Sequence, residues 1–149
     1  MTSEARTRLL EHREKFERAV PWGRALWVTL EAYDFTPSHV RRADDGVWMV
    51  QVHPPRAEQD RYGLAPEVLL LVVDGEVLGR HLRAAGDEVI RSGLRLDAKL
   101  VIVADRPKAA ECTAPLGERL QRIPGNEQRV AWVSDGEAWP DLRVELARQ

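Results

Sequence analysis

The apolar residues at the start of the chain recur at helical spacing. Residues 4–19 place them every three or four positions, Ser3 precedes them as a possible N-cap, and Pro21 follows them. A serine cap favours helix initiation, and a proline interrupts the helical hydrogen-bond ladder. The pattern therefore predicts a helix over residues 4–19 whose charged side faces solvent.

Two segments with strand-like patterns come next. In residues 24–35 apolar side chains alternate with other residues, which is the period of a half-buried strand. Residues 47–55 form a second strand pattern that ends in two prolines, and the turn-rich residues 36–46 connect the two. The sequence thus predicts an antiparallel strand pair, followed by an exposed polar loop over residues 56–66.

The second half of the chain has continuous apolar runs at residues 68–73, 100–104 and 129–134. Such runs are typical of strands that are covered on both faces, as in a parallel sheet. Apolar residues return to helical spacing at residues 78–89 and again at residues 109–123. These segments predict two helices between the three strands.

Strands that alternate with helices favour parallel pairing with right-handed crossovers. We therefore expect a single α/β domain over residues 1–149. Its mixed sheet would contain an N-terminal helix and an antiparallel strand pair, then a parallel β-α-β-α-β unit with helices on the faces, Rossmann-like in its last three strands. Residues 141–149 fit either a last strand or a short helix.

The composition of the chain excludes several classes of protein but does not indicate an activity. The 149 residues are 44% hydrophobic and 31% charged with a net charge of −2, so there is no overall basic field to hold nucleic acid. The first twenty residues are too charged for a signal peptide, and no apolar run is long enough to span a bilayer. The single cysteine, Cys112, excludes an intrachain disulfide framework. These features predict a cytoplasmic protein without a membrane segment.

An aspartate follows each of the three predicted parallel strands: Asp74, Asp105 and Asp135. Parallel strands end on one side of the sheet, and ligands bind there. Because neighbouring strands lie about 4.8 Å apart, these carboxylates could share a Mg²⁺ ion, which prefers oxygen ligands. Such an ion can activate water or neutralise a phosphoryl group. The sequence therefore leaves open a magnesium-dependent phosphoesterase or nuclease.

The same aspartates also suit ordinary turns and helix caps. Asp74 and Asp135 precede glycine, which gives a common turn dipeptide. Asp105 precedes Arg106 and Pro107, which suits the first turn of a helix. In this interpretation the three carboxylates are structural, and no cofactor is required.

Five tryptophans are many for a chain of this length. Trp27 and Trp48 fall on the predicted strand pair, and Trp139 follows a turn. Indoles are favoured at protein contacts, although ordinary core packing is the simpler explanation. Arg41 and Arg42 add a small basic spot that two neighbouring aspartates partly cancel. We take Trp27, Trp48 and Trp139, together with the two arginines, as candidates for binding a partner.

The sequence identifies no catalytic set. The histidines, His12, His39, His53 and His81, are scattered, and none has metal-ligand spacing to another. His81 flanks the apolar side of its predicted helix, which indicates a structural role. No glycine-rich phosphate-binding motif occurs.

The sequence favours a non-catalytic α/β module that contacts another protein, or a second copy of itself, in a larger cytoplasmic assembly. The alternatives are the magnesium-dependent enzyme and, third, a small-ligand or nucleotide sensor that uses the same strand-end crevice. The binding-module hypothesis predicts an exposed apolar patch. The enzyme hypothesis requires the three aspartates to lie within the coordination span of one metal ion.

Overall fold

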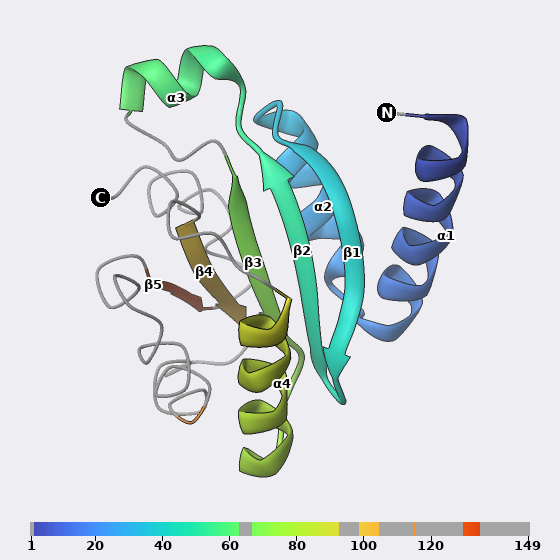
Figure 1. Ribbon diagram of the computed structural model, residues 1–149, viewed down its shortest axis with the longest axis vertical. Helices are drawn as coiled ribbons and strands as arrows, with labels where there is room; N and C mark the ends of the chain where they lie inside the picture. Colours follow the sequence, from blue (N-terminus) through green and yellow to red (C-terminus); the bar gives the residue numbers. More distant parts are fainter. Residues whose placement is uncertain (1, 63–66, 93–98, 105–114, 116–129, 135–149) are drawn as a thin grey trace.

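The computed structural model of the chain describes residues 2–62, 67–92, 99–104, 115 and 130–134 (Figure 1). The helices of this part are α1 (Ser3–Ala19), α2 (Gly23–Ala32), α3 (Arg56–Tyr62) and α4 (Gly79–Arg91). The strands are β1 (Thr36–Asp44), β2 (Val47–His53), β3 (Val68–Val73), β4 (Lys99–Ala104) and β5 (Val130–Ser134). Among these residues, none of the helices combines the length and the apolar character that a bilayer span requires.

Within the described residues the strands form one five-stranded sheet in the order β1-β2-β3-β4-β5. Strand β2 pairs antiparallel with β1 and β3, whereas β4 pairs parallel with β3 and β5. The predicted mixed α/β class is therefore confirmed. All but residue 115 of the helix predicted over residues 109–123 lies outside the described residues, so the complete β-α-β-α-β unit stays a prediction.

Helices pack against both faces of the sheet. Helices α1 and α2 bury Phe16 and Leu30 against one face, which we call the first face. Helix α4 buries Leu82 and Val89 against the opposite, second face. The side chains of β3 alternate between these two apolar clusters, and all six of its residues are buried. The continuous apolar pattern of this strand follows from burial on both faces.

Helix α2 stands where alternation predicted a strand over residues 24–35. The buried residues of this helix are spaced i, i+3, i+4 and i+7: Gly23, Leu26, Trp27 and Leu30. Val28, which alternation placed on the inner side with Leu26 and Leu30, is 51% exposed. The strand prediction was wrong because a short apolar stretch can satisfy both periods.

The end of α2 sets the start of β1. Asp34 adopts a left-handed conformation with φ of 60°, and the Phe35 N–H donates to the Leu30 carbonyl over 2.9 Å. This is the Schellman arrangement, which satisfies carbonyls at the end of a helix and turns the chain away. The chain then enters β1 in the segment predicted as a turn-rich connection. The strand that precedes β2 and pairs with it across the turn is therefore β1, and not residues 24–35.

Other boundaries differ less. Thr2, one residue before the predicted cap Ser3, accepts the Ala5 N–H at the start of α1 over 3.1 Å. Helix α3 occupies much of the segment predicted as an exposed loop. The remaining predicted strands and the helix near residue 78 are confirmed to within two residues.

The β1–β2 turn depends on Gly46. Its φ of 78° lies in the left-handed region, and an added Cβ would stand 2.6 Å from the Val77 Cγ2 atom. We expect Gly46→Ala to lower the free energy of unfolding by about 1–3 kcal/mol, through backbone strain and overpacking. Chemical denaturation measures this change. Gly79→Ala is the control, because its Cβ would meet the flexible end of the exposed Arg83; a loss equal to that of Gly46→Ala would contradict the prediction.

Candidate functional site

The carboxyl ends of β3, β4 and β5 lie along one rim of the sheet. Val73 at the end of β3 pairs with Ala104 at the end of β4, and Ala104 pairs with Ser134 at the end of β5. This alignment is the one that the predicted strand-end metal site requires. Asp105 and Asp135 lie outside the described residues, so their part in such a site stays a prediction.

Asp74 is half-buried at this rim and is bonded to other parts of the chain. Its Oδ1 atom accepts the indole N–H of Trp22 over 3.1 Å, and its backbone N–H donates to the Gly46 carbonyl over 3.0 Å. The N-cap of α4 is Leu78, which makes no side-chain capping bond. Asp74 is therefore not the cap of the following helix, because α4 begins five residues after it. Through these two bonds Asp74 links the end of β3 to Trp22, which lies between α1 and α2, and to Gly46 in the β1–β2 turn.

The candidate tryptophans on the first half of the chain belong to the core. Trp27 is 3% exposed and Trp48 is 8% exposed. The Phe16 ring packs between them, with its centroid 5.6 Å from that of Trp48 and 6.4 Å from that of Trp27. Their burial under α1 removes both indoles from the surface that was predicted to meet a partner. Trp139 lies outside the described residues.

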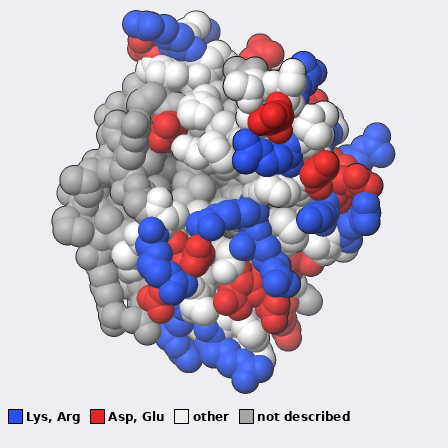
Figure 2. All heavy atoms as spheres, turned by 45° about the vertical axis from the view of Figure 1, so that its right-hand side comes forward, with Lys and Arg blue, Asp and Glu red and all other residues white. Residues whose placement is uncertain are grey.

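The candidate arginines are exposed and ion-paired. Arg41 contacts Glu88 of α4 over 3.0 Å, and Arg42 contacts Asp45 over 3.2 Å. Basic and acidic side chains interleave on the face shown in Figure 2. This face therefore has no extended basic surface of the kind that binds a nucleic-acid backbone.

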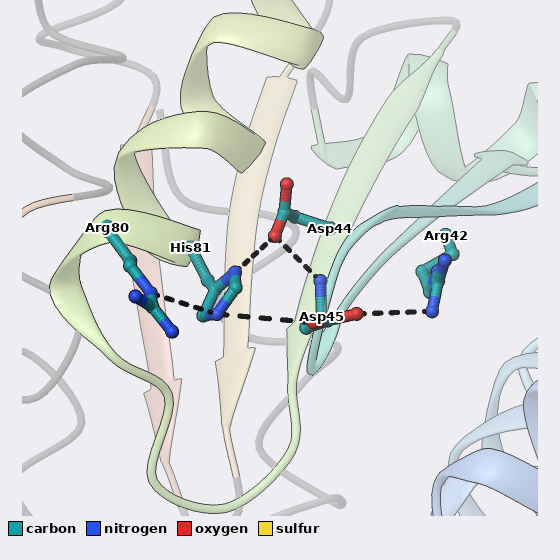
Figure 3. Close-up of polar contacts among 5 residues, drawn as sticks. All are labelled: Arg42, Asp44, Asp45, Arg80 and His81. Carbon is teal, nitrogen blue, oxygen red and sulfur yellow. Dashed lines mark hydrogen bonds and ion pairs between the residues drawn. The ribbon is translucent and has the colours of Figure 1, made fainter.

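A cluster of potential metal ligands lies where the β1–β2 turn meets the first turn of α4 (Figure 3). His81 Nδ1 lies 2.6 Å from Asp44 Oδ1, and His81 Nε2 lies 4.0 Å from Asp45 Oδ2. No pattern in the sequence predicts this cluster, because Asp44 and His81 are 37 positions apart. The signal available was the Asp44-Asp45 pair at a turn, which was interpreted as partial compensation of Arg41 and Arg42.

The pKa of the Asp44 carboxyl is held below its ordinary value. The largest cause is the backbone N–H of Asp45, which donates to Asp44 Oδ1 over 2.9 Å. The hydrogen bond with His81 and the charge of Arg42 lower the pKa further, His81 adds to this when its imidazole is protonated, and desolvation opposes them. Asp44 is therefore ionised at neutral pH and stays an acceptor for the imidazole.

A hollow of about 690 Å³ lies beside strand β1. Its walls come from the first half of α1, from β1, from the adjoining parts of β2 and β3, and from Ser92 at the end of α4. This volume falls within the range of ligand pockets. The lining combines apolar Leu9, Val40, Met49 and Leu69 with polar Arg8, His12, Ser38, His39, Arg41, Gln51 and Glu67.

Four large apolar side chains of the described residues are exposed. They lie on three helices or at their ends, as Leu10, Val28, Leu78 and Ile90. Leu78 and Ile90 stand about 18 Å apart along α4. The exposed apolar patch that a binding module predicts stays a prediction, and the apolar lining of the hollow is the candidate contact in the described residues.

The lowered pKa of Asp44 makes its contribution to stability depend on pH. A depressed folded-state pKa stabilises the fold above the ordinary pKa of aspartate, and this stabilisation is lost as the pH falls through the lower folded-state pKa. We therefore expect Asp44→Asn to be less stable than the parent at neutral pH, with the difference shrinking below about pH 4. Denaturation at a series of pH values tests this. A difference that stays constant from neutral to acidic pH would contradict it.

Comparisons with protein-family models, with curated proteins and with solved structures give no match to this chain.

Proposed function

We propose that the chain is a non-catalytic binding module that holds an acidic, partly apolar segment of another protein in the hollow beside β1. The observation that carries this proposal is the hollow itself, which has a volume of about 690 Å³ and is lined by both apolar and basic side chains. Apolar lining supplies affinity, and a small number of charged groups fix the orientation of the bound segment.

The position of β1 supports an extended segment as the occupant. β1 is the first strand in the order of the sheet, so its outer side is not paired with another strand of the described sheet. Peptides commonly bind by adding to such an edge. Two irregularities of register, between Pro37 and His39 and between Arg42 and Asp44, disfavour indiscriminate edge pairing. Selection then depends on the side chains that line the hollow.

The charges in the hollow favour an acidic partner. Arg8 lies one turn before His12 on α1, and Arg8 has no ion pair among the described residues. Arg41 adds a second guanidinium, shared with Glu88. Glu67 is the acidic side chain of the lining. Arginine forms paired hydrogen bonds with carboxylates, so an Asp or Glu of the partner fits this lining.

A library of random peptides displayed on phage and selected against the full chain tests this proposal. We expect the enriched peptides to combine Asp or Glu with apolar residues. Replacing both Arg8 and Arg41 by Glu should raise the dissociation constant of a selected synthetic peptide at least about tenfold, because like charges then face each other. Isothermal titration calorimetry measures the change.

The matched control is Lys15→Glu, which reverses one charge on the exposed side of the same helix. It should leave peptide affinity unchanged. Thermal unfolding of each variant shows whether the fold is retained. A selection that enriches no peptide, or peptides that bind the double variant as tightly as the parent, would overturn the proposal.

A magnesium-dependent phosphoesterase or nuclease is the second candidate. The alignment of the ends of β3, β4 and β5 along one rim favours it. Against it stands the bond of Asp74 to the Trp22 indole, which already uses one oxygen of the described carboxylate at that rim.

Thermal shifts with Mg²⁺, Mn²⁺ and nucleotides separate the two candidates. For a binding module we expect no Mg²⁺-dependent stabilisation, and a small change in stability in Asp74→Asn, since its amide oxygen still accepts the Trp22 N–H. Stabilisation of the parent by Mg²⁺ that is lost in Asp74→Asn would favour the enzyme, because a ligand stabilises the folded state to which it binds.

A further inference from the structure

The cluster at the junction of the β1–β2 turn and α4 has a donor set that the binding module does not use. We propose that Asp45 and His81 bind a divalent transition-metal ion, with Asp44 holding the imidazole in place. The ion would join the β1–β2 turn to the first turn of α4. This inference is independent of the hollow, whose lining includes neither Asp45 nor His81.

Hydrogen bonds around His81 assign its two ring nitrogens. Arg80 Nε points at His81 Nε2 over 3.4 Å, and a guanidinium can only donate. Nε2 is therefore the nitrogen with the free electron pair, and Nδ1 carries the proton that it donates to Asp44 over 2.6 Å. A carboxylate that accepts the second ring N–H is the usual outer partner of a metal-binding histidine.

The distances fit this division of roles. The separation of 2.6 Å between Asp44 Oδ1 and His81 Nδ1 is that of a hydrogen bond. His81 Nε2 and Asp45 Oδ2 lie 4.0 Å apart, so one ion about 2.0–2.2 Å from each would need a nearly linear arrangement, and a tetrahedral site requires the exposed Asp45 side chain to move closer to the ring. Figure 3 shows Asp45 on the Nε2 side of the ring and Asp44 on the Nδ1 side.

The donor types select the class of metal. One imidazole nitrogen with one carboxylate oxygen suits Zn²⁺ and Co²⁺ better than Mg²⁺ or Ca²⁺, which prefer oxygen ligands. Water would complete the coordination, since two side chains leave positions open. His81 is 25% exposed and Asp45 is 67% exposed at the side chain, so an ion can reach them from solvent.

The two ligands are held by separate, well-fixed elements. Gly46 places the turn in its left-handed conformation against Val77, and the Gly46 carbonyl accepts the Asp74 N–H. His81 belongs to the first turn of α4, where its N–H donates to the Leu78 carbonyl. An ion therefore meets donors that are already near each other, which lowers the entropic cost of binding.

Two arginines compete with the ion. Arg42 pairs with Asp45 over 3.2 Å, and Arg80 contacts His81 Nε2. Arg42, Asp45 and Arg80 are all exposed, and contacts of exposed charges contribute little to stability. Displacing these arginines therefore costs little, and removing one of them should strengthen metal binding.

Titration of the full chain with Zn²⁺ in a calorimeter, and with Co²⁺ by visible absorption, tests the proposal. We expect His81→Ala and Asp45→Asn each to raise the dissociation constant at least about tenfold, and Asp44→Asn to raise it about 10–100-fold through the lost orientation of the ring. Arg42→Ala should lower it. His81→Gln serves as a second variant should His81→Ala fail to fold, as judged by circular dichroism.

Controls separate this site from other donors of the chain. His12→Ala removes a histidine far from the cluster in sequence, Cys112→Ser removes the thiol, and Asp74→Asn removes the strand-end carboxylate. All three should bind Zn²⁺ as the parent does. Loss of binding in a control, unchanged binding in His81→Ala and His81→Gln, or no binding by the parent would overturn the proposal.

Discussion

The complete burial of β3 is the constraint on which the rest of the structure depends. All six residues of this strand are buried, and they alternate between two apolar clusters. A strand of this kind is stable only when both faces of its sheet are covered. Helices α1 and α2 cover the first face, and α4 covers the second. The hollow lies between the first half of α1 and strand β1, and the ligand cluster lies where the β1–β2 turn meets α4.

Much of this arrangement could be predicted from the sequence, because burial leaves a pattern in it. The continuous apolar runs predicted β3 and β4, and the steps through Leu82, Ala85 and Val89 predicted α4. The errors fall where the pattern is short or polar. The alternation of Leu26, Val28 and Leu30 concealed the helical spacing of α2, since tertiary packing and not alternation decided which side chains are buried. Strand β1 was missed because it is an edge strand with many exposed polar residues.

The strand-end rim could be predicted from the sequence, whereas the hollow beside β1 and the ligand cluster could not. Parallel pairing brought the ends of β3 and β4 to one rim, as the runs before Asp74 and Asp105 predicted. The contact of Asp44 with His81 depends on how the β1–β2 turn meets α4, and no local pattern of the sequence contains that information. Likewise, the role of Asp74 as acceptor for the Trp22 indole links residues that are 52 positions apart.

That indole–carboxylate bond has a consequence for communication within the molecule. Trp22 is the first residue before α2, and Asp74 is the first residue after β3. The bond therefore couples the helical layer on the first face to the strand-end rim. A ligand that drew the Asp74 carboxylate away would break this bond and change the surroundings of the Trp22 indole, so an event at the rim would be felt at the start of α2.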